Sequence, residues 1–172
     1  KLIIDQSKEL HIDLIGFTDC RCLWDIKDYL AYRIDNHIYT EFEEMDIEKR
    51  INPKMTFSDC KSIIVIGISY NVNDKRESPN ILKGNLSMSS WGLDYHNVLK
   101  KKIEQLVDEL KKSLDFNYKY FVDTGPLVDR ELAKKAGIGF YGKNCSIINK
   151  EYGSFIFLGY ILTDLEMNIE KK

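Results

Sequence analysis

YFVDTGPLVDRELAKKAGIGFYGKNCSIINKEYGSFIFLG, residues 120–159, is the stretch that decides the fold. It opens with a short apolar run, residues 120–122, which predicts a strand that stops at Asp123. Pro126 stands just ahead of apolar residues at helical spacing, and proline is favoured at the start of helices. The stretch therefore predicts a strand, a turn that carries a carboxylate, and a helix over residues 127–136.

Glycines interrupt the regular secondary structure predicted in the second half of this stretch. Strand-like runs at 145–149 and 154–163 flank a turn at 151–153. Four glycines allow the backbone to approach a bulky ligand closely, or simply to turn: Gly137, Gly139, Gly142 and Gly153. Asp123 has two interpretations as well, because aspartate at a strand end is a typical reacting group but also a preferred helix cap. The residues alone leave both interpretations open.

The rest of the chain alternates strand-like and helix-like segments. Helical spacing is found over residues 2–10, 23–34, 41–50 and, after residue 96, in a long segment that ends near Leu114. The helix over 41–50 should end before Asn52-Pro53, because the residue before a proline is disfavoured in a helix. The continuous apolar run at 62–70 predicts a central strand covered on both faces. Residues 71–87 are polar and predict a loop that closes over a ligand or is disordered.

These segments predict an α+β fold of three layers. We expect helices on both faces of a mixed, largely antiparallel central sheet, with strands from 12–17, 62–70, 118–123, 145–149 and 154–163. The alternative is a doubly wound parallel sheet, because strands and helices alternate through the first 125 residues.

Composition narrows the class of protein. A chain of 172 residues is about one domain, so residues 1–172 are expected to form a single domain. A net charge of −2 means that any RNA contact must use a local basic patch. The sequence contains no run of 18 apolar residues, so it predicts no membrane-spanning helix. The four cysteines include no CxxC pair, which favours a reduced, cytoplasmic chain with isolated thiols.

Three pieces of sequence, in this order, resemble the epoxyqueuosine reductase family: SWGLDYH at 90–96, VDTGPLVDRELAKKAGIGFYGKN at 122–144, and GSFIFLG at 153–159. The resemblance extends from about Arg50 to Leu165. It implies a nitroreductase-like cobalamin domain and the two-electron removal of the epoxide oxygen from epoxyqueuosine at the tRNA wobble position, which gives queuosine and water. It also implies cobalamin without an amino-acid ligand on cobalt, two [4Fe–4S] clusters, and an electron donor to the clusters.

The resemblance assigns the general acid to Asp123, because the departing oxygen needs a proton. An ordinary aspartate has a pKa near ~3.9 and is ionised at neutral pH. Protonated Asp123 therefore requires burial against the corrin, which would raise its pKa, or delivery of a proton at the moment of reaction.

Cofactor contacts are also assigned by the resemblance. The residues expected near the corrin or the substrate are Arg50, Ser89, Trp91, Asn144, Ile147, Asn149 and Gly153. No metal-ligating residue is expected. His96 is a conceivable cobalt ligand, but the chain lacks the Asp-x-His-x-x-Gly pattern of cobalamin domains that use histidine, so a structural role is the expectation.

The chain departs from the family pattern in two places, at the cluster cysteines and at residue 160. No cluster-type cysteine run occurs, so the iron–sulfur domain is expected to be absent from this chain and the isolated chain to be inactive. Tyr160 stands where relatives commonly carry glutamate. Two alternatives remain: a corrinoid-dependent reductase of another substrate, similar to reductive dehalogenases, and a non-catalytic corrinoid-binding protein.

Overall fold

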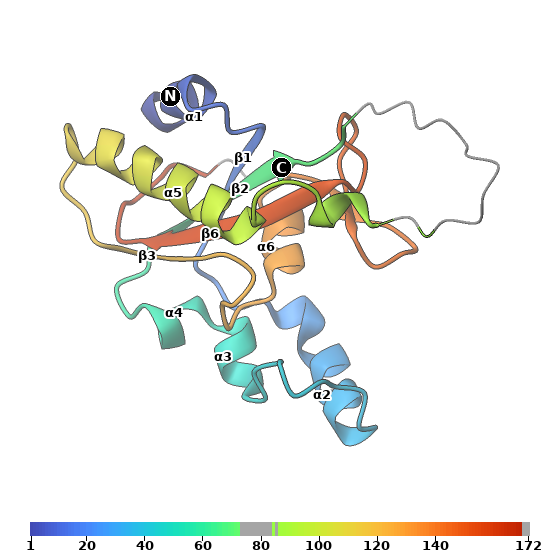
Figure 1. Cartoon of the computed structure of the whole chain (residues 1–172). Coiled ribbons are helices and arrows are strands. Elements are labelled where there is room, and N and C mark those ends of the chain that lie inside the picture. The colour runs from blue at the N-terminus through green and yellow to red at the C-terminus, as the bar shows by residue number, and fades with distance from the viewer. Residues whose placement is uncertain (73–83, 85, 170–172) are drawn as a thin grey trace.

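The computed structural model describes residues 1–72, 84 and 86–169, and its centre is a four-stranded sheet (Figure 1). The strand order is β1-β2-β6-β3, and every neighbouring pair is antiparallel. The strands are β1 (Leu14–Asp19), β2 (Ser62–Ser69), β3 (Tyr118–Phe121) and β6 (Ile156–Thr163). The parallel alternative is therefore wrong for this sheet.

The two central strands are those that the apolar runs predict. Residues 62–67 of β2 are all buried, and β2 pairs with β6 along its whole length, from Ser62 opposite Thr163 to Ser69 opposite Ile156. Because a strand with two covered faces has no solvent side, its sequence is continuously apolar rather than alternating.

The strand predicted at 145–149 does not join the central sheet, so that part of the prediction is wrong. Only β5 (Ile147–Ile148) forms there, and it pairs with β4 (Phe140–Tyr141) in a separate two-stranded sheet. Gly139 explains the close return of the chain: a Cβ at this position would lie 2.5 Å from the Ile148 carbonyl oxygen. The glycines fold this segment on itself beside the sheet.

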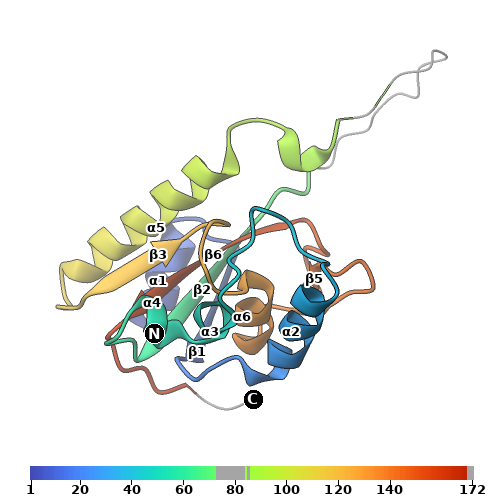
Figure 2. The same ribbon diagram turned by 90° about the horizontal axis from the view of Figure 1, so that it is seen from below.

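Helices cover both faces of the sheet, which confirms the three-layer prediction (Figures 1 and 2). One face carries α1 (Leu2–Glu9) and α5 (Tyr95–Lys111). The buried stripe of α5 consists of Leu99, Ile103, Leu106, Val107 and Leu110. The other face carries α6 (Asp129–Lys135), the 3-10 helix η1 (Trp24–Ile26), α2 (Lys27–Asp35), α3 (Ile47–Ile51) and α4 (Pro53–Thr56).

The helix predicted over 41–50 is shorter than expected. It starts only at Ile47, because Asp46 accepts hydrogen bonds from the backbone N–H groups of Glu48 and Lys49 and so caps the helix there. It ends at Ile51, ahead of Pro53, as the proline predicts. Most of the loop predicted at 71–87 lies outside the described residues.

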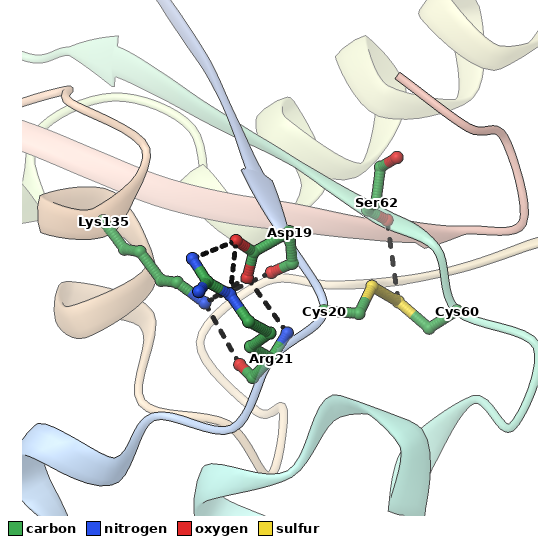
Figure 3. A network of polar contacts seen from close by, with 6 residues as sticks. All are labelled: Asp19, Cys20, Arg21, Cys60, Ser62 and Lys135. Atoms are coloured by element: carbon green, nitrogen blue, oxygen red, sulfur yellow. Dashed lines mark hydrogen bonds and ion pairs between the residues drawn. A yellow bond between two sulfur atoms is a disulfide. The ribbon is translucent and has the colours of Figure 1, made fainter. Parts of the chain in front are cut away.

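A disulfide joins Cys20, just after β1, to Cys60, just before β2 (Figure 3). The expectation of isolated thiols is therefore wrong for this pair, whereas Cys22 and Cys145 are free. Cysteines 40 positions apart meet because β1 and β2 pair antiparallel and bring the end of one strand to the start of the other. None of the described helices has the length and apolar character to cross a membrane.

Beside the disulfide, an ion cluster holds α6 against the end of β1 (Figure 3). Asp19 accepts a hydrogen bond of 2.8 Å from Nε of Arg21 and one of 2.7 Å from Nζ of Lys135. Burial alone would raise the pKa of Asp19, but these hydrogen bonds outweigh it and hold the pKa well below its usual range. The ionised carboxylate therefore persists in the folded chain and anchors α6.

Candidate active site

Asp123 lies at the mouth of a cavity, on the turn between β3 and α6. Its backbone is in the left-handed region, with φ of 61°, and its side chain is 62% exposed. A left-handed aspartate is uncommon and strained, and such residues cluster at functional sites. The turn therefore directs the carboxylate away from the core, as a residue that meets a ligand requires.

The cavity beside Asp123 has two adjoining parts, with volumes of about 1010 Å³ and about 460 Å³. Both parts are lined by Phe42, Glu43, Glu44, Asp123, Gly125 and Pro126. Phe42 is 90% exposed, so the segment before α3 presents an apolar rim to the opening. The smaller part extends toward α6 and β6 and contains most of the charged groups described next.

The start of α5 supplies a histidine that contacts Asp123. Asp94 caps this helix by accepting the backbone N–H of His96, and its Oδ1 also lies 2.7 Å from Nδ1 of the His96 ring. The other ring nitrogen, Nε2, lies 3.4 Å from Oδ2 of Asp123. The hydrogen bond to Asp94 raises the pKa of His96 above its ordinary value, and the contact with Asp123 adds to this rise. The prediction of a structural role for His96 is thus incomplete, because the imidazole reaches the candidate acid.

Tyr95 completes this side of the cavity. Its ring stacks on His96 at 3.9 Å and on Phe157 of β6 at 4.1 Å between ring centroids. Burial raises the pKa of Tyr95 to about 12, and the neighbouring Asp123 carboxylate adds to the effect. Tyr95 therefore stays neutral and fixes the position of the imidazole.

Two buried polar atoms beneath Asp123 have no hydrogen-bond partner within the described part of the chain: Oδ1 of Asp129 and the hydroxyl oxygen of Tyr160. Burial, and then the charge of Asp123, raise the pKa of Asp129 to about 7. An unpaired buried polar atom is costly, so it requires an explanation, such as a catalytic role or a bound group that supplies the missing hydrogen bond. The sequence alone points to neither residue as part of the cavity, although Asp129 lies only six positions after Asp123, within the same motif.

Arg50 lines the smaller part of the cavity together with Asp123, so the structure brings these two predicted residues together. Its Nη1 donates to Oε2 of Glu43 at 2.9 Å, and Arg33 makes two further hydrogen bonds to the same carboxylate. The Arg33 hydrogen bond lowers the pKa of Glu43 against the opposing effect of burial, and Arg50 adds to the lowering. Arg33 and Glu43 were not predicted, because their partnership joins separate segments of sequence.

The other predicted residues lie outside the lining of this cavity. Ser89 belongs to the 3-10 helix η2 (Met88–Ser90), and Trp91 follows it and donates from Nε1 to the Leu86 carbonyl oxygen. Ile147 is buried in the core beneath α6. Asn144 accepts a hydrogen bond from the backbone N–H of Ser146.

Asn149 and Gly153 form a turn of their own beyond β5. They pair backbone to backbone, and the Asn149 side chain also donates to the Ile138 carbonyl oxygen at 2.6 Å. Gly153 has φ of 61°, and a Cβ built there would make ordinary van der Waals contact with the Phe155 ring at 3.8 Å. The structure shows the scaffold roles of these side chains, and their cofactor contacts stay predictions.

Gly125 has no side chain, which lets the turn after Asp123 lie close to the core. Gly125→Ala is expected to lower the free energy of unfolding by about 1–3 kcal/mol, because the added methyl group would overpack this contact. A Cβ here would overlap the buried Tyr160 hydroxyl and lie 2.8 Å from Cβ of Phe121. Urea denaturation measures the loss. The control is Gly84→Ala, where an added Cβ meets nothing within 4 Å. Equal stability of the two variants would show that the turn relaxes freely.

Comparisons with known proteins identify the same family that the sequence motifs resemble. The family described as epoxyqueuosine reductase QueG, DUF1730, matches residues 50–124. The chain is 40% identical over 164 residues to the epoxyqueuosine reductase of Lactococcus garvieae, which covers 94% of this chain and 47% of the relative. It is 40% identical over 167 residues to that of Bacillus subtilis, with 95% of this chain and 43% of the relative covered.

Solved structures match the fold as well. The epoxyqueuosine reductase of Streptococcus thermophilus superposes with a TM-score of 0.90 at 38% identity, covering 99% of this chain and 47% of that one. An epoxyqueuosine reductase with an epoxyqueuosine-modified tRNA-Tyr stem loop gives a TM-score of 0.88 at 38% identity, with the same coverage. The chain thus spans about half the length of the relatives that it matches.

Proposed function

Because the chain belongs to the epoxyqueuosine reductase family, we propose that it forms the corrinoid-binding catalytic part of an enzyme that removes the epoxide oxygen of epoxyqueuosine in tRNA. The observation that carries this proposal is Asp123, a strained and exposed carboxylate at the mouth of a cavity. The enzyme of Bacillus subtilis offers a parallel, since one of its structures has a catalytic aspartate loop swung out of the active site. Asp123 also stands on a loop, between β3 and α6.

In this proposal the cavity binds cobalamin, which would supply the two electrons for the reduction. The fit rests on the unpaired Oδ1 of Asp129, because the amide groups around a corrin ring donate hydrogen bonds of the kind that this atom lacks. The predicted cofactor contacts remain part of the proposal: Arg50, Ser89, Trp91, Asn144, Ile147, Asn149 and Gly153.

The protein's own contribution to the reaction is a positioned proton. Asp123 donates to the departing oxygen as general acid, which contributes typically ~10²–10⁴-fold in rate. Tyr95, neutral and stacked, holds the neighbouring imidazole in place, and Phe42 lines the cavity with an apolar side chain. Each of these steps uses groups that line the cavity or contact Asp123.

We propose that the two [4Fe–4S] clusters implied by the family are held outside this chain. Each cluster takes four cysteine thiolates, and the chain has four cysteines in all, two of them in a disulfide. An isolated chain is therefore expected to bind cobalamin but to lack electron supply from a donor. The proposed partner is tRNA with epoxyqueuosine at the wobble position, and the proposed compartment is the cytoplasm, where tRNA is modified.

A titration of this chain with cob(II)alamin tests the proposal. We expect saturable binding, with visible and paramagnetic-resonance spectra that lack nitrogen coordination to cobalt, because both ring nitrogens of His96 face carboxylates. Conversion of an epoxyqueuosine-containing stem loop is then measured with the chain in its full-length protein. Cobalamin binding without any conversion would favour the non-catalytic corrinoid-binding protein, and no binding by the full-length protein would reject the corrinoid site.

Gly153→Phe is expected to weaken cobalamin binding by about tenfold or more, because the proposed corrin edge would meet an aromatic ring where the turn now carries no side chain. Gly153→Asn is the control for a small added side chain, since asparagine tolerates the left-handed backbone. Phenylalanine strains this backbone, so urea denaturation of both variants separates that strain from the loss of a cofactor contact. Equal cobalamin affinity of the two variants and the natural chain would place the turn away from the corrin.

A further inference from the structure

The candidate acid belongs to a row of three side chains whose middle member is a histidine. His96 lies between Asp94, 2.7 Å from its Nδ1, and Asp123, 3.4 Å from its Nε2. Stacking on Tyr95 holds the ring from one face. An imidazole fixed between two carboxylates has one nitrogen tied to an orienting partner and the other directed at the acceptor of its proton.

We propose that His96, oriented by Asp94, delivers the proton that Asp123 passes to the substrate oxygen. This inference rests on the proposed function, because it answers how Asp123 becomes a proton donor. Asp94 acts here as a positioning residue, and His96 acts through Asp123.

The transfer balances in atoms and charge. The N–H bond at Nε2 of the His96 imidazolium breaks, and an O–H bond forms at Oδ2 of Asp123, so that a charged pair becomes a neutral pair. Removal of the epoxide oxygen as water consumes two protons and two electrons, and the corrinoid of the proposed function would supply the electrons. His96 is 40% exposed on its side chain, so solvent can recharge it and both protons can follow the same route.

Desolvation supplies the driving force for this transfer. In the open cavity Asp123 is 62% exposed, and water stabilises its carboxylate beside a protonated His96. With the proposed cofactor and substrate bound, this water would be excluded, and burial would disfavour the charged forms of both Asp123 and His96. The proton then moves from His96 to Asp123 when the substrate is in place. The structure thus favours delivery at the moment of reaction over permanent burial of Asp123.

Among the described residues, two charged groups act on His96: Asp94 at the start of its own helix, and Asp123 on the turn that faces it. The ring also touches Tyr95, which burial keeps neutral. Both carboxylates raise the pKa of His96. The imidazolium is therefore more abundant at neutral pH than for an ordinary histidine, as a proton donor requires.

The first test is the pH dependence of turnover in the full-length protein. Turnover should fall as pH rises through the pKa of His96, because the donor loses its proton. Asp94→Asn should move this alkaline limb to lower pH, since the hydrogen bond that raises the pKa is weakened. His96→Gln should lower turnover by roughly 10²-fold or more and abolish the limb. A merely structural role would lower turnover at every pH without moving the limb.

The second test needs no activity. The chain has three histidines, whose ring proton shifts can be followed by NMR as the pH changes. His96 should titrate above the ordinary value of ~6.5, and both Asp94→Asn and Asp123→Asn should lower its pKa. His11→Asn, an exposed histidine with a left-handed backbone that asparagine tolerates, is the control and should change neither the NMR titration of His96 nor the pH profile.

The outcomes separate this inference from the proposed function. If the natural protein converts the stem loop and His96→Gln keeps the same rate and alkaline limb, the inference is overturned while the function stands. If His96 titrates at or below the ordinary value, or ignores Asp94→Asn, the inference is overturned even without an assay. Absence of both cobalamin binding and conversion in the natural full-length protein would overturn the proposed function, and with it the inference.

Discussion

Asp123→Asn is expected to lower conversion of epoxyqueuosine-containing tRNA by roughly 10²–10⁴-fold, with cobalamin affinity unchanged, when measured in the full-length protein. Asparagine keeps the size of the side chain and tolerates the left-handed backbone at this position, so the turn should persist. It cannot donate an acidic proton, so the loss should fall on the rate of the chemical step rather than on binding. Single-turnover conversion of a tRNA stem loop separates these two quantities.

The matched control for this variant is Asp108→Asn, the same chemical change at an exposed position of α5. It should leave both conversion and cobalamin affinity as they are in the natural protein. Conversion by Asp123→Asn within a few-fold of the natural rate would remove Asp123 as the acid. A parallel loss of cobalamin affinity would instead indicate that the turn supports the cofactor.

Breaking the Cys20–Cys60 disulfide is expected to lower the free energy of unfolding by about 4 kcal/mol, from the loop-entropy relation for the 40 positions that it spans. The variant is Cys20→Ser combined with Cys60→Ser, which leaves no unpaired thiol behind. Both sulfur positions are buried, so the loss of packing acts in the same direction. Urea denaturation of the oxidised protein provides the measurement.

Cys145→Ser serves as the control, because Cys145 is free and exposed and its loss should change stability little. Counting thiols by alkylation and mass spectrometry adds a second check: the oxidised protein should expose two thiols, and the reduced protein four. Four thiols under oxidising conditions would show that the bond does not form. Disulfides are rare in the cytosol, so the same count on protein taken from cells also tests the proposed compartment.

Much of the fold follows from local sequence. The continuous apolar run of β2, the stripe along α5 and the proline-led turn before α6 all predict their elements, because burial on both faces, helical periodicity and the fixed φ of proline are properties of neighbouring residues. The place of Asp123 after a strand leaves a capping role and a reacting role open, and the resemblance in sequence assigns both Asp123 and Arg50 to the site. Both line the same cavity.

The predictions from sequence that the structure contradicts share a physical cause, because each depends on contacts between segments that are distant in the chain. The segment at 145–149 reads as a strand, but whether it joins the central sheet depends on where the glycines return the chain. Cys20 and Cys60 looked isolated because only the antiparallel pairing of β1 with β2 brings them together. The same holds for Glu43, whose two arginine partners lie in different helices.

The sequence by itself determined the family, the α+β class and the identity of the candidate acid, since these depend on motifs and on periodicities within short stretches. Only the tertiary structure decided which side chains surround that acid. It set His96 between Asp94 and Asp123, and it buried Oδ1 of Asp129 with no hydrogen-bond partner among the residues that the structure describes. The pKa of each group depends on distance and water exclusion, and these quantities exist only once α5, β3 and α6 have packed together.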